Sequence, residues 1–77
     1  MNVYPNPFAN QFALEYTFNA GDQIVLLDIH GKQVFTETLK SFSESVLIQT
    51  NNLSKGMYVL QVNTKQGVLS KKILKMY

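Results

Sequence analysis

The chain offers few side chains that could do chemistry. Besides seven lysines and four tyrosines, its ionisable side chains are one histidine and five carboxylates, and it has no cysteine. His30 follows Asp28 by two residues in a turn that also contains Gly31. A hydrolytic triad would need His30 as the base, Asp28 to orient it and a serine from elsewhere. Side chains of a glycine-containing turn usually face solvent, so we interpret His30 as a turn residue and predict a protein that is not an enzyme.

Two aspartates are the candidates for a metal site. Calcium takes about six to eight oxygen ligands, and the spacing of Asp22 and Asp28 matches no calcium-binding loop. Both lie in predicted turns, where an aspartate commonly caps backbone N–H groups. The chain also lacks a glycine-rich phosphate loop. We therefore expect two turn caps, no metal ion and no cofactor.

Aromatic side chains could instead form a platform for stacking on sugars. Most of them alternate with polar residues in predicted strands, which favours core packing, and tryptophan, the usual stacking residue, is absent. A carbohydrate- or protein-binding module of an extracellular enzyme or adhesin stays open as the alternative function. The residues concerned are Tyr4, Phe8, Phe12, Tyr16, Phe18, Phe35, Phe42 and Tyr58.

The elements that position these side chains are predicted to be short strands. Alternation is clearest over residues 11–18, with Phe12, Leu14, Tyr16 and Phe18 facing inward. Residues 23–28 are more continuously apolar, which predicts a strand covered on both sides. Other strands are predicted over residues 33–39 and 45–49, and over residues 58–64 and 67–76, which form a hairpin.

The first strand is predicted to be short, because the prolines within residues 3–8 allow pairing only briefly and at an edge. About seven short strands separated by turns predict an all-β fold, a small seven-stranded antiparallel Ig-like β-sandwich. With 77 residues, the chain is expected to form one domain, residues 1–77.

Composition excludes several classes of protein. The net charge is +2 and the pI is near 9.0, but all the basic residues are lysines and no nucleic-acid-binding motif accompanies them. No apolar run approaches the ~20 residues that span a bilayer, and residues 1–5 do not resemble a signal peptide. We expect neither nucleic-acid binding nor a membrane span, and an exported form would take its signal from elsewhere on a longer chain.

The last predicted strand breaks its alternation at Lys71 and Lys72. One interpretation is an edge strand that lysines protect against pairing with other chains. The other is a basic strand presented to a partner, to whose sheet it can add. The same edge is also available for a dimer. The residues alone do not separate these interpretations.

Three blocks of sequence, in this order, resemble the C-terminal sorting domain of type IX secretion substrates. They are Tyr4-Pro5-Asn6-Pro7-Phe8, then Leu26-Leu27-Asp28-Ile29-His30-Gly31-Lys32-Gln33-Val34, then Leu53-Ser54-Lys55-Gly56-Met57-Tyr58-Val59-Leu60-Gln61-Val62 followed by the lysine-bearing end. The resemblance covers essentially the whole chain and implies a seven-stranded sandwich.

The resemblance implies that the chain is a secretion signal, a domain excised from a larger secreted protein of a Gram-negative bacterium. That protein would cross the inner membrane by a separate signal, and the domain would direct it through the outer-membrane translocon. A sortase-like peptidase at the cell surface would then remove the domain, and the cargo would be released or anchored at the surface. By position, the sorting motif comprises Pro5, Asn6, Pro7, Asp28, Gly31, Gly56 and Tyr58, and the recognised tail comprises Lys71, Lys72 and Lys75.

Overall fold

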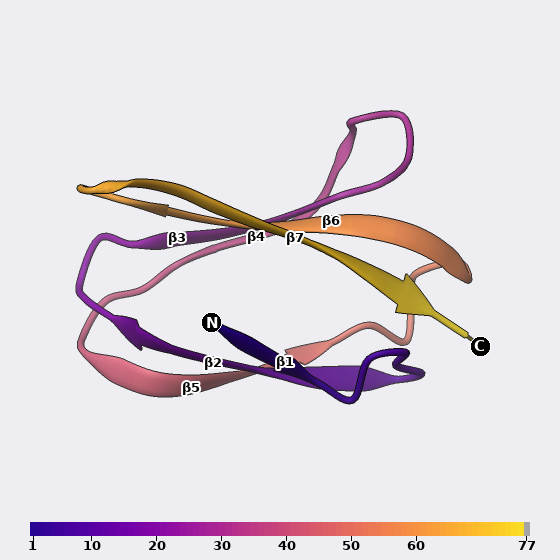
Figure 1. Cartoon of the computed structure of the whole chain (residues 1–77), viewed down its shortest axis with the longest axis horizontal. Helices are drawn as coiled ribbons and strands as arrows, with labels where there is room; N and C mark the ends of the chain where they lie inside the picture. The colour runs from indigo at the N-terminus through magenta and orange to yellow at the C-terminus, as the bar shows by residue number, and fades with distance from the viewer. Residues whose placement is uncertain (77) are drawn as a thin grey trace.

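Seven strands form two sheets in the computed structural model of the chain, which describes residues 1–76 (Figure 1). One sheet has the order β1-β2-β5 and the other β4-β3-β6-β7, and all neighbouring strands are antiparallel. The predicted all-β sandwich is confirmed. The strands are β1 (Asn2–Tyr4), β2 (Gln11–Phe18), β3 (Gln23–Leu27), β4 (Gln33–Thr38), β5 (Ser43–Gln49), β6 (Gly56–Thr64) and β7 (Gly67–Lys75).

Connectivity follows the immunoglobulin-like pattern. The first, second and fifth strands share one sheet, as strands A, B and E do in that fold, and the remaining strands form the other. β6 lies between β3 and β7, so the predicted hairpin of β6 and β7 supplies an inner and an edge strand of the larger sheet. The described part of the chain has no helix with the length and apolarity that a membrane span requires.

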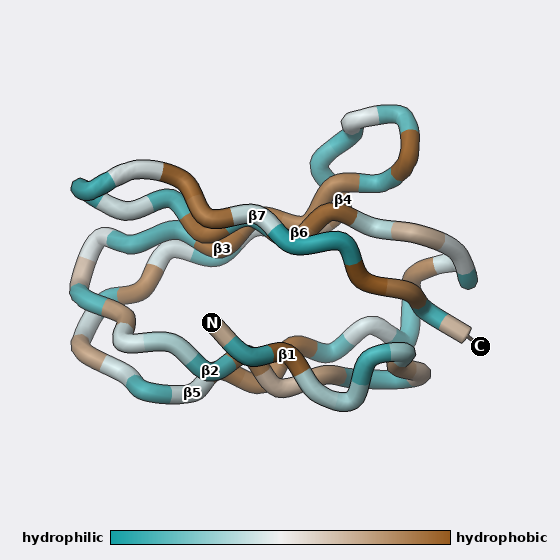
Figure 2. Tube along the Cα trace, in the orientation of Figure 1, coloured by the Kyte–Doolittle hydropathy of each residue, from teal (hydrophilic) through white to brown (hydrophobic). Residues whose placement is uncertain are grey.

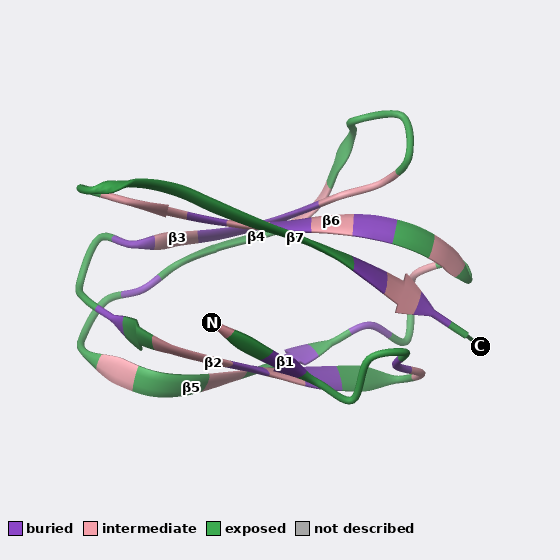
Figure 3. Cartoon of the chain, in the orientation of Figure 1, coloured by how far each residue is buried: buried purple, intermediate pink, exposed green. Residues whose placement is uncertain are grey.

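The core lies between the two sheets, where every second residue of the inner strands points (Figure 3). The predicted inward residues of β2 are buried, except that Tyr16 is half-buried. The register between β2 and β5 shifts between Glu15 and Phe18, and this shift interrupts the strict alternation of inward and outward side chains there. Each fully buried large apolar side chain contributes about 1.5–3 kcal/mol. The largest are Phe8, Phe12, Phe18, Leu14, Ile24, Leu26, Ile48, Leu60 and Ile73.

β3 is covered on both faces, as its apolar run predicts. Ile24 and Leu26 face the core, while Val25 on the opposite face is only 2% exposed. Val25 is buried although no further layer of the described structure covers the outer face of this sheet, because it lies between its neighbours Thr36 of β4 and Gln61 of β6. Colouring by hydropathy shows the apolar segments of both sheets (Figure 2).

Some predicted strand limits are wrong by one or two residues. β5 starts at Ser43 rather than at residue 45, because Ser43 pairs with Phe18 beyond the register shift in β2. β6 starts at Gly56 rather than Tyr58, because Gly56 pairs with Lys75. β3, β4 and β7 each end one residue earlier than predicted. Tyr77, within the predicted domain, lies outside the described residues.

Candidate functional site

Three sequence blocks that lie far apart in the chain converge at one end of the sandwich. β3 ends there, β6 begins there, and β7 ends there, because Leu27 pairs with Val59 and Gly56 pairs with Lys75. The turn that follows β3 and residues 5–8 lie at the same end, to the right in Figure 1. We call this the motif end. It brings together all the predicted sorting-motif residues and, of the predicted tail residues, Lys75.

Asp28 organises the turn between β3 and β4. Its Oδ1 accepts hydrogen bonds from the N–H groups of His30 (2.8 Å) and Lys32 (3.0 Å), and its carbonyl accepts one from Gly31 (3.0 Å). The Lys32 N–H, followed by the His30 N–H and the charges of both residues, lowers the pKa of the Asp28 carboxyl. Gly31 has φ 81°, the left-handed conformation that the turn demands. The predicted turn cap is confirmed.

His30 is exposed at the tip of that turn, as expected of a turn residue. A shallow groove runs beside it, lined by His30 and Ile29 of this turn and by Met57 and Tyr58 of β6. The carboxylate of Asp28 binds backbone N–H groups, which is the task of a turn cap rather than of a catalytic triad.

Asp22 caps a different turn, at the opposite end of β3. It is 5% exposed, and its Oδ2 accepts a hydrogen bond of 2.9 Å from the Asn19 N–H. Its backbone carbonyl also accepts a bond from the Leu39 N–H. Among residues 1–76 no three histidine, aspartate or glutamate side chains gather into a metal-binding cluster.

Tyr58 ties the loop before β6 to the strand itself. Its side chain is buried, and its hydroxyl donates a hydrogen bond of 2.5 Å to the Ser54 carbonyl. A tyrosine near the start of strand F that bonds back to the chain a few residues upstream is the tyrosine corner of immunoglobulin-like sandwiches. Burial, reinforced by the charge of Asp28, raises the pKa of the Tyr58 phenol. Gly56, two residues earlier, has φ 140°.

Residues 5–8 form what we call the clamp, which covers the edge of β7 at its C-terminal end. The Phe8 N–H donates to the Leu74 carbonyl (2.9 Å), and the Phe8 carbonyl accepts from the Met76 N–H (2.8 Å). The Asn6 Oδ1 accepts a third bond, from the Leu74 N–H (3.2 Å). The Tyr4–Pro5 and Asn6–Pro7 peptide bonds are cis. Pro5, Asn6 and Pro7 are exposed, whereas Phe8 is 1% exposed and fixes the clamp in the core.

The three lysines of the predicted tail lie in two different environments. Lys75 is 3% exposed; its Nζ donates to the Ala9 carbonyl and lies 5.9 Å from the centre of the Phe8 ring. Lys71 and Lys72 are exposed on the preceding part of β7. Lys75 therefore has internal partners in Phe8 of the clamp and the adjacent Ala9, whereas the other two lysines stay exposed.

Nothing in the local sequence indicates the clamp, because Asn6 and Leu74 are 68 residues apart. A signal for the burial of Lys75 was present, however. Residues 73 and 75 fall on the same face of a strand, and Ile73 belongs to the core face. Alternation continued through the last strand would have placed Lys75 inward.

The aromatic side chains of residues 1–76 do not assemble into a binding platform. Phe8, Phe12, Phe18 and Tyr58 are buried, and Tyr16 and Phe35 pack against the core. Tyr4 and Phe42 are exposed by 49% and 59%, but they lie toward opposite ends of β2. Tyr4 pairs with Ala13, and Phe42 precedes Ser43, the partner of Phe18.

One protein-family model covers all three sequence blocks. The family model described as "Secretion system C-terminal sorting domain" matches residues 2–76, which include all seven strands and the clamp. No curated protein matches the chain.

Proposed function

This chain belongs to the family of secretion system C-terminal sorting domains, and on that premise we propose that it forms the C-terminal part of a larger exported protein. The family marks a C-terminal secretion signal of the type IX system, and a protein that carries it is secreted or displayed at the cell surface. The family is a sorting signal rather than a catalytic domain. The family match across the whole sandwich is the observation that carries the proposal.

In the proposed route, the cargo crosses the inner membrane of a Gram-negative bacterium by a separate N-terminal signal. The domain folds in the periplasm, and the outer-membrane translocon of the type IX system then binds it. A sortase-like peptidase at the cell surface removes the domain, so that the cargo is released or attached to a surface anchor. The family supports the role of the secretion machinery, and these steps are our proposal for this chain.

Within this route, we assign recognition to Lys71 and Lys72. Both are exposed on β7, and neither the adjacent strand β6 nor the clamp contains a carboxylate to neutralise them. Asp28 lines the same surface pocket as Lys72, but its carboxylate binds the His30 and Lys32 N–H groups. An uncompensated positive edge attracts a negatively charged partner and raises the rate of encounter. Lys75, in contrast, contributes by holding the clamp closed, while the turn of Asp28 and the corner of Tyr58 keep the motif end in shape.

A reporter fusion tests the proposal. The reporter carries its own N-terminal signal and ends in residues 1–77, and it is produced in a bacterium that has a type IX system. We expect the reporter outside the outer membrane, and in the periplasm when the translocon gene is deleted. A variant with Leu60→Asp in the core, which should not fold, serves as the control for a folded signal. A folded fusion that stays in the periplasm of the intact host would contradict the proposal.

A further inference from the structure

The first two thirds of β7 form an edge that none of residues 1–76 covers. Residues 67–72 are all exposed, whereas Ile73 and Lys75 are buried (Figure 3). Val68 and Leu69 are 60% and 38% exposed although both are apolar. β6 pairs with this stretch on one side, and the clamp reaches only residues 74 and 76 on the other. We call residues 68–72 the open edge.

The hydrogen-bond pattern shows which backbone groups point out of the open edge. In an antiparallel pair, residues alternately bond to the neighbouring strand and point away from it. The N–H and the carbonyl of Leu74 both bond to the clamp, so Leu74 points away from β6. The register between β6 and β7 is regular throughout. Val68, Ser70 and Lys72 therefore present their N–H and C=O groups outward, and Leu69 and Lys71 bond to β6.

The open edge is the most regular of the four sheet edges in the described residues. β7 has nine residues, whereas β1 has three, β4 six and β5 seven. The pairing of β4 and that of β5 each contain a register shift, a device that discourages further strand addition. β7 has no such shift. Among the edge strands longer than three residues in the described part of the chain, only β7 pairs along its whole length without a register shift.

The charges of the open edge select the kind of strand that can pair there. Lys71 and Lys72 are consecutive, so their side chains lie on opposite faces of the sheet. A strand added to β7 would meet one ammonium group on each face. A second copy of this chain would bring four lysines into one short ladder, which is unfavourable. A strand with carboxylates would be stabilised on both faces.

We propose that the open edge, residues 68–72, binds an extended acidic segment of the secretion machinery by strand addition. This inference rests on the proposed function and specifies how the partner is recognised. Val68, Ser70 and Lys72 pair with the backbone of the acidic segment, and Lys71 and Lys72 contact its carboxylates. The clamp limits the length of the added strand, because Asn6 already occupies the Leu74 N–H. The same lysines exclude self-association and select the acidic partner.

The backbone N–H of Ser70 allows strand addition to be distinguished experimentally from simple charge attraction. The N–H of Ser70 points outward, so Ser70→Pro removes a donor to the partner without removing a bond to β6. Ser70→Ala is the matched control, because it removes the hydroxyl and keeps the N–H. In the reporter fusion, we expect Ser70→Pro to reduce secretion roughly tenfold or more, the effect of losing an interfacial hydrogen bond. Ser70→Ala should be secreted like the unaltered fusion.

The outcomes are distinguishable. If Ser70→Pro folds, with an unchanged urea midpoint, and is secreted at the level of Ser70→Ala, strand addition at the open edge is wrong and the sorting function stands. If the unaltered fusion is not exported, the proposed function itself fails. The oligomeric state is a further check, because a dimer of the purified domain that Ser70→Pro dissociates would assign the edge to a second copy instead.

Amide hydrogen exchange gives a test that does not depend on how the proline variant folds. In the free domain, the amides of Val68, Ser70 and Lys72 should exchange much faster than those of Leu69 and Lys71. Adding detergent-solubilised type IX translocon should slow exchange at the three outward amides. Slowing confined to the turn of residues 28–31 would place the contact at the motif end and overturn the inference.

Discussion

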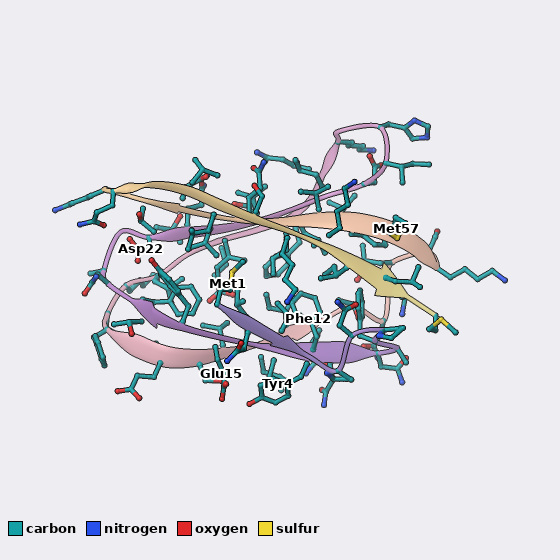
Figure 4. All side chains as sticks on the ribbon, in the orientation of Figure 1. Met1, Tyr4, Phe12, Glu15, Asp22 and Met57 are labelled. Carbon is teal, nitrogen blue, oxygen red and sulfur yellow. The ribbon has the colours of Figure 1, made fainter. Side chains whose placement is uncertain are left out.

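The two parts of β7 differ in what their edge does. Residues 73–75 pair with β6 on one side, and on the other the clamp bonds to Leu74 and to Met76 just beyond the strand; Ile73 and Lys75 are buried among core residues. Residues 67–72 pair only with β6 and are exposed throughout. In the side-chain view, Phe12 lies between the two sheets and Met57 lies by the start of β6 at the motif end (Figure 4). One strand thus combines a part that stabilises the domain with a part that is free to bind.

Within the nine residues of β7, the held part would serve stability and the open part would serve recognition. Substitutions in the held part should change the free energy of unfolding, whereas substitutions in the open part should change secretion. A sorting domain must fold and be recognised, so this division allows each property to be tested while the other is kept constant. The following experiments test the division in order of expected effect.

The largest difference is expected between Ile73 and Val68. Ile73→Ala should lower the free energy of unfolding by about 2–5 kcal/mol, because it leaves a cavity in the core. Val68→Ala should change it by less than about 0.5 kcal/mol, because the side chain is already mostly in solvent. Urea unfolding followed by far-UV circular dichroism measures both. Similar losses for the two variants would contradict the division.

A smaller difference is expected between two lysines of the same strand. Lys75→Ala should cost about 1–3 kcal/mol, because it leaves the Ala9 carbonyl without its charged donor and removes packing over Phe8. Lys75→Met keeps most of the apolar stem and isolates the contribution of the hydrogen bond. Lys72→Ala should leave the urea midpoint unchanged. If Lys75→Ala were also neutral, Lys75 would not be holding the clamp.

The clamp itself is tested by Asn6→Ala. Loss of its bond to the Leu74 N–H should cost about 0.5–1.5 kcal/mol. Exchange of the Leu74 amide should accelerate, while that of Lys72, which has no bond to the clamp, should not change. Asn2→Ala on β1, an exposed asparagine outside the clamp, is the control. Unaltered exchange at Leu74 would show that Asn6 does not hold this edge.

The smallest effect concerns pH and the turn of Asp28. The folded-state pKa of Asp28 lies below its ordinary value of 3.8, because the Lys32 and His30 N–H groups bind the carboxylate. The resulting stabilisation is present above pH 3.8 and is lost as the pH falls through the lowered pKa. Asp28→Asn, which keeps an acceptor but cannot titrate, should flatten this acid dependence. Urea midpoints measured across that range for both proteins check the prediction, and identical slopes would contradict it.

The fold was largely predictable because its signals are local. Alternation of apolar and polar residues in β2 and the two-residue loop of Lys65 and Gln66 both act within a few positions, as does the turn around Gly31. Such patterns together determine where a strand lies, how it pairs with its neighbour and which of its side chains face inward. Two of the errors in strand limits arose where pairing with another strand extended an element, at Ser43 and Gly56.

The candidate site was less predictable because its decisive contacts are not local. The three motif blocks give no sign in themselves that they meet at one end, and nothing near Asn6 indicates that it bonds to residue 74. Charge was also an incomplete guide. Lys71 and Lys75 look alike in sequence, yet one faces solvent and the other is enclosed by Phe8 and Ala9. The role of each lysine in recognition stays a prediction.

The most direct test is secretion of a reporter that carries Lys71→Glu and Lys72→Glu, with the urea midpoint measured on the same purified domain. Lys40→Glu and Lys55→Glu, two exposed lysines outside β7, form the matched control. The account predicts that the β7 double variant stays in the periplasm while its midpoint equals that of the control. Secretion of that folded variant at the level of the control would contradict it.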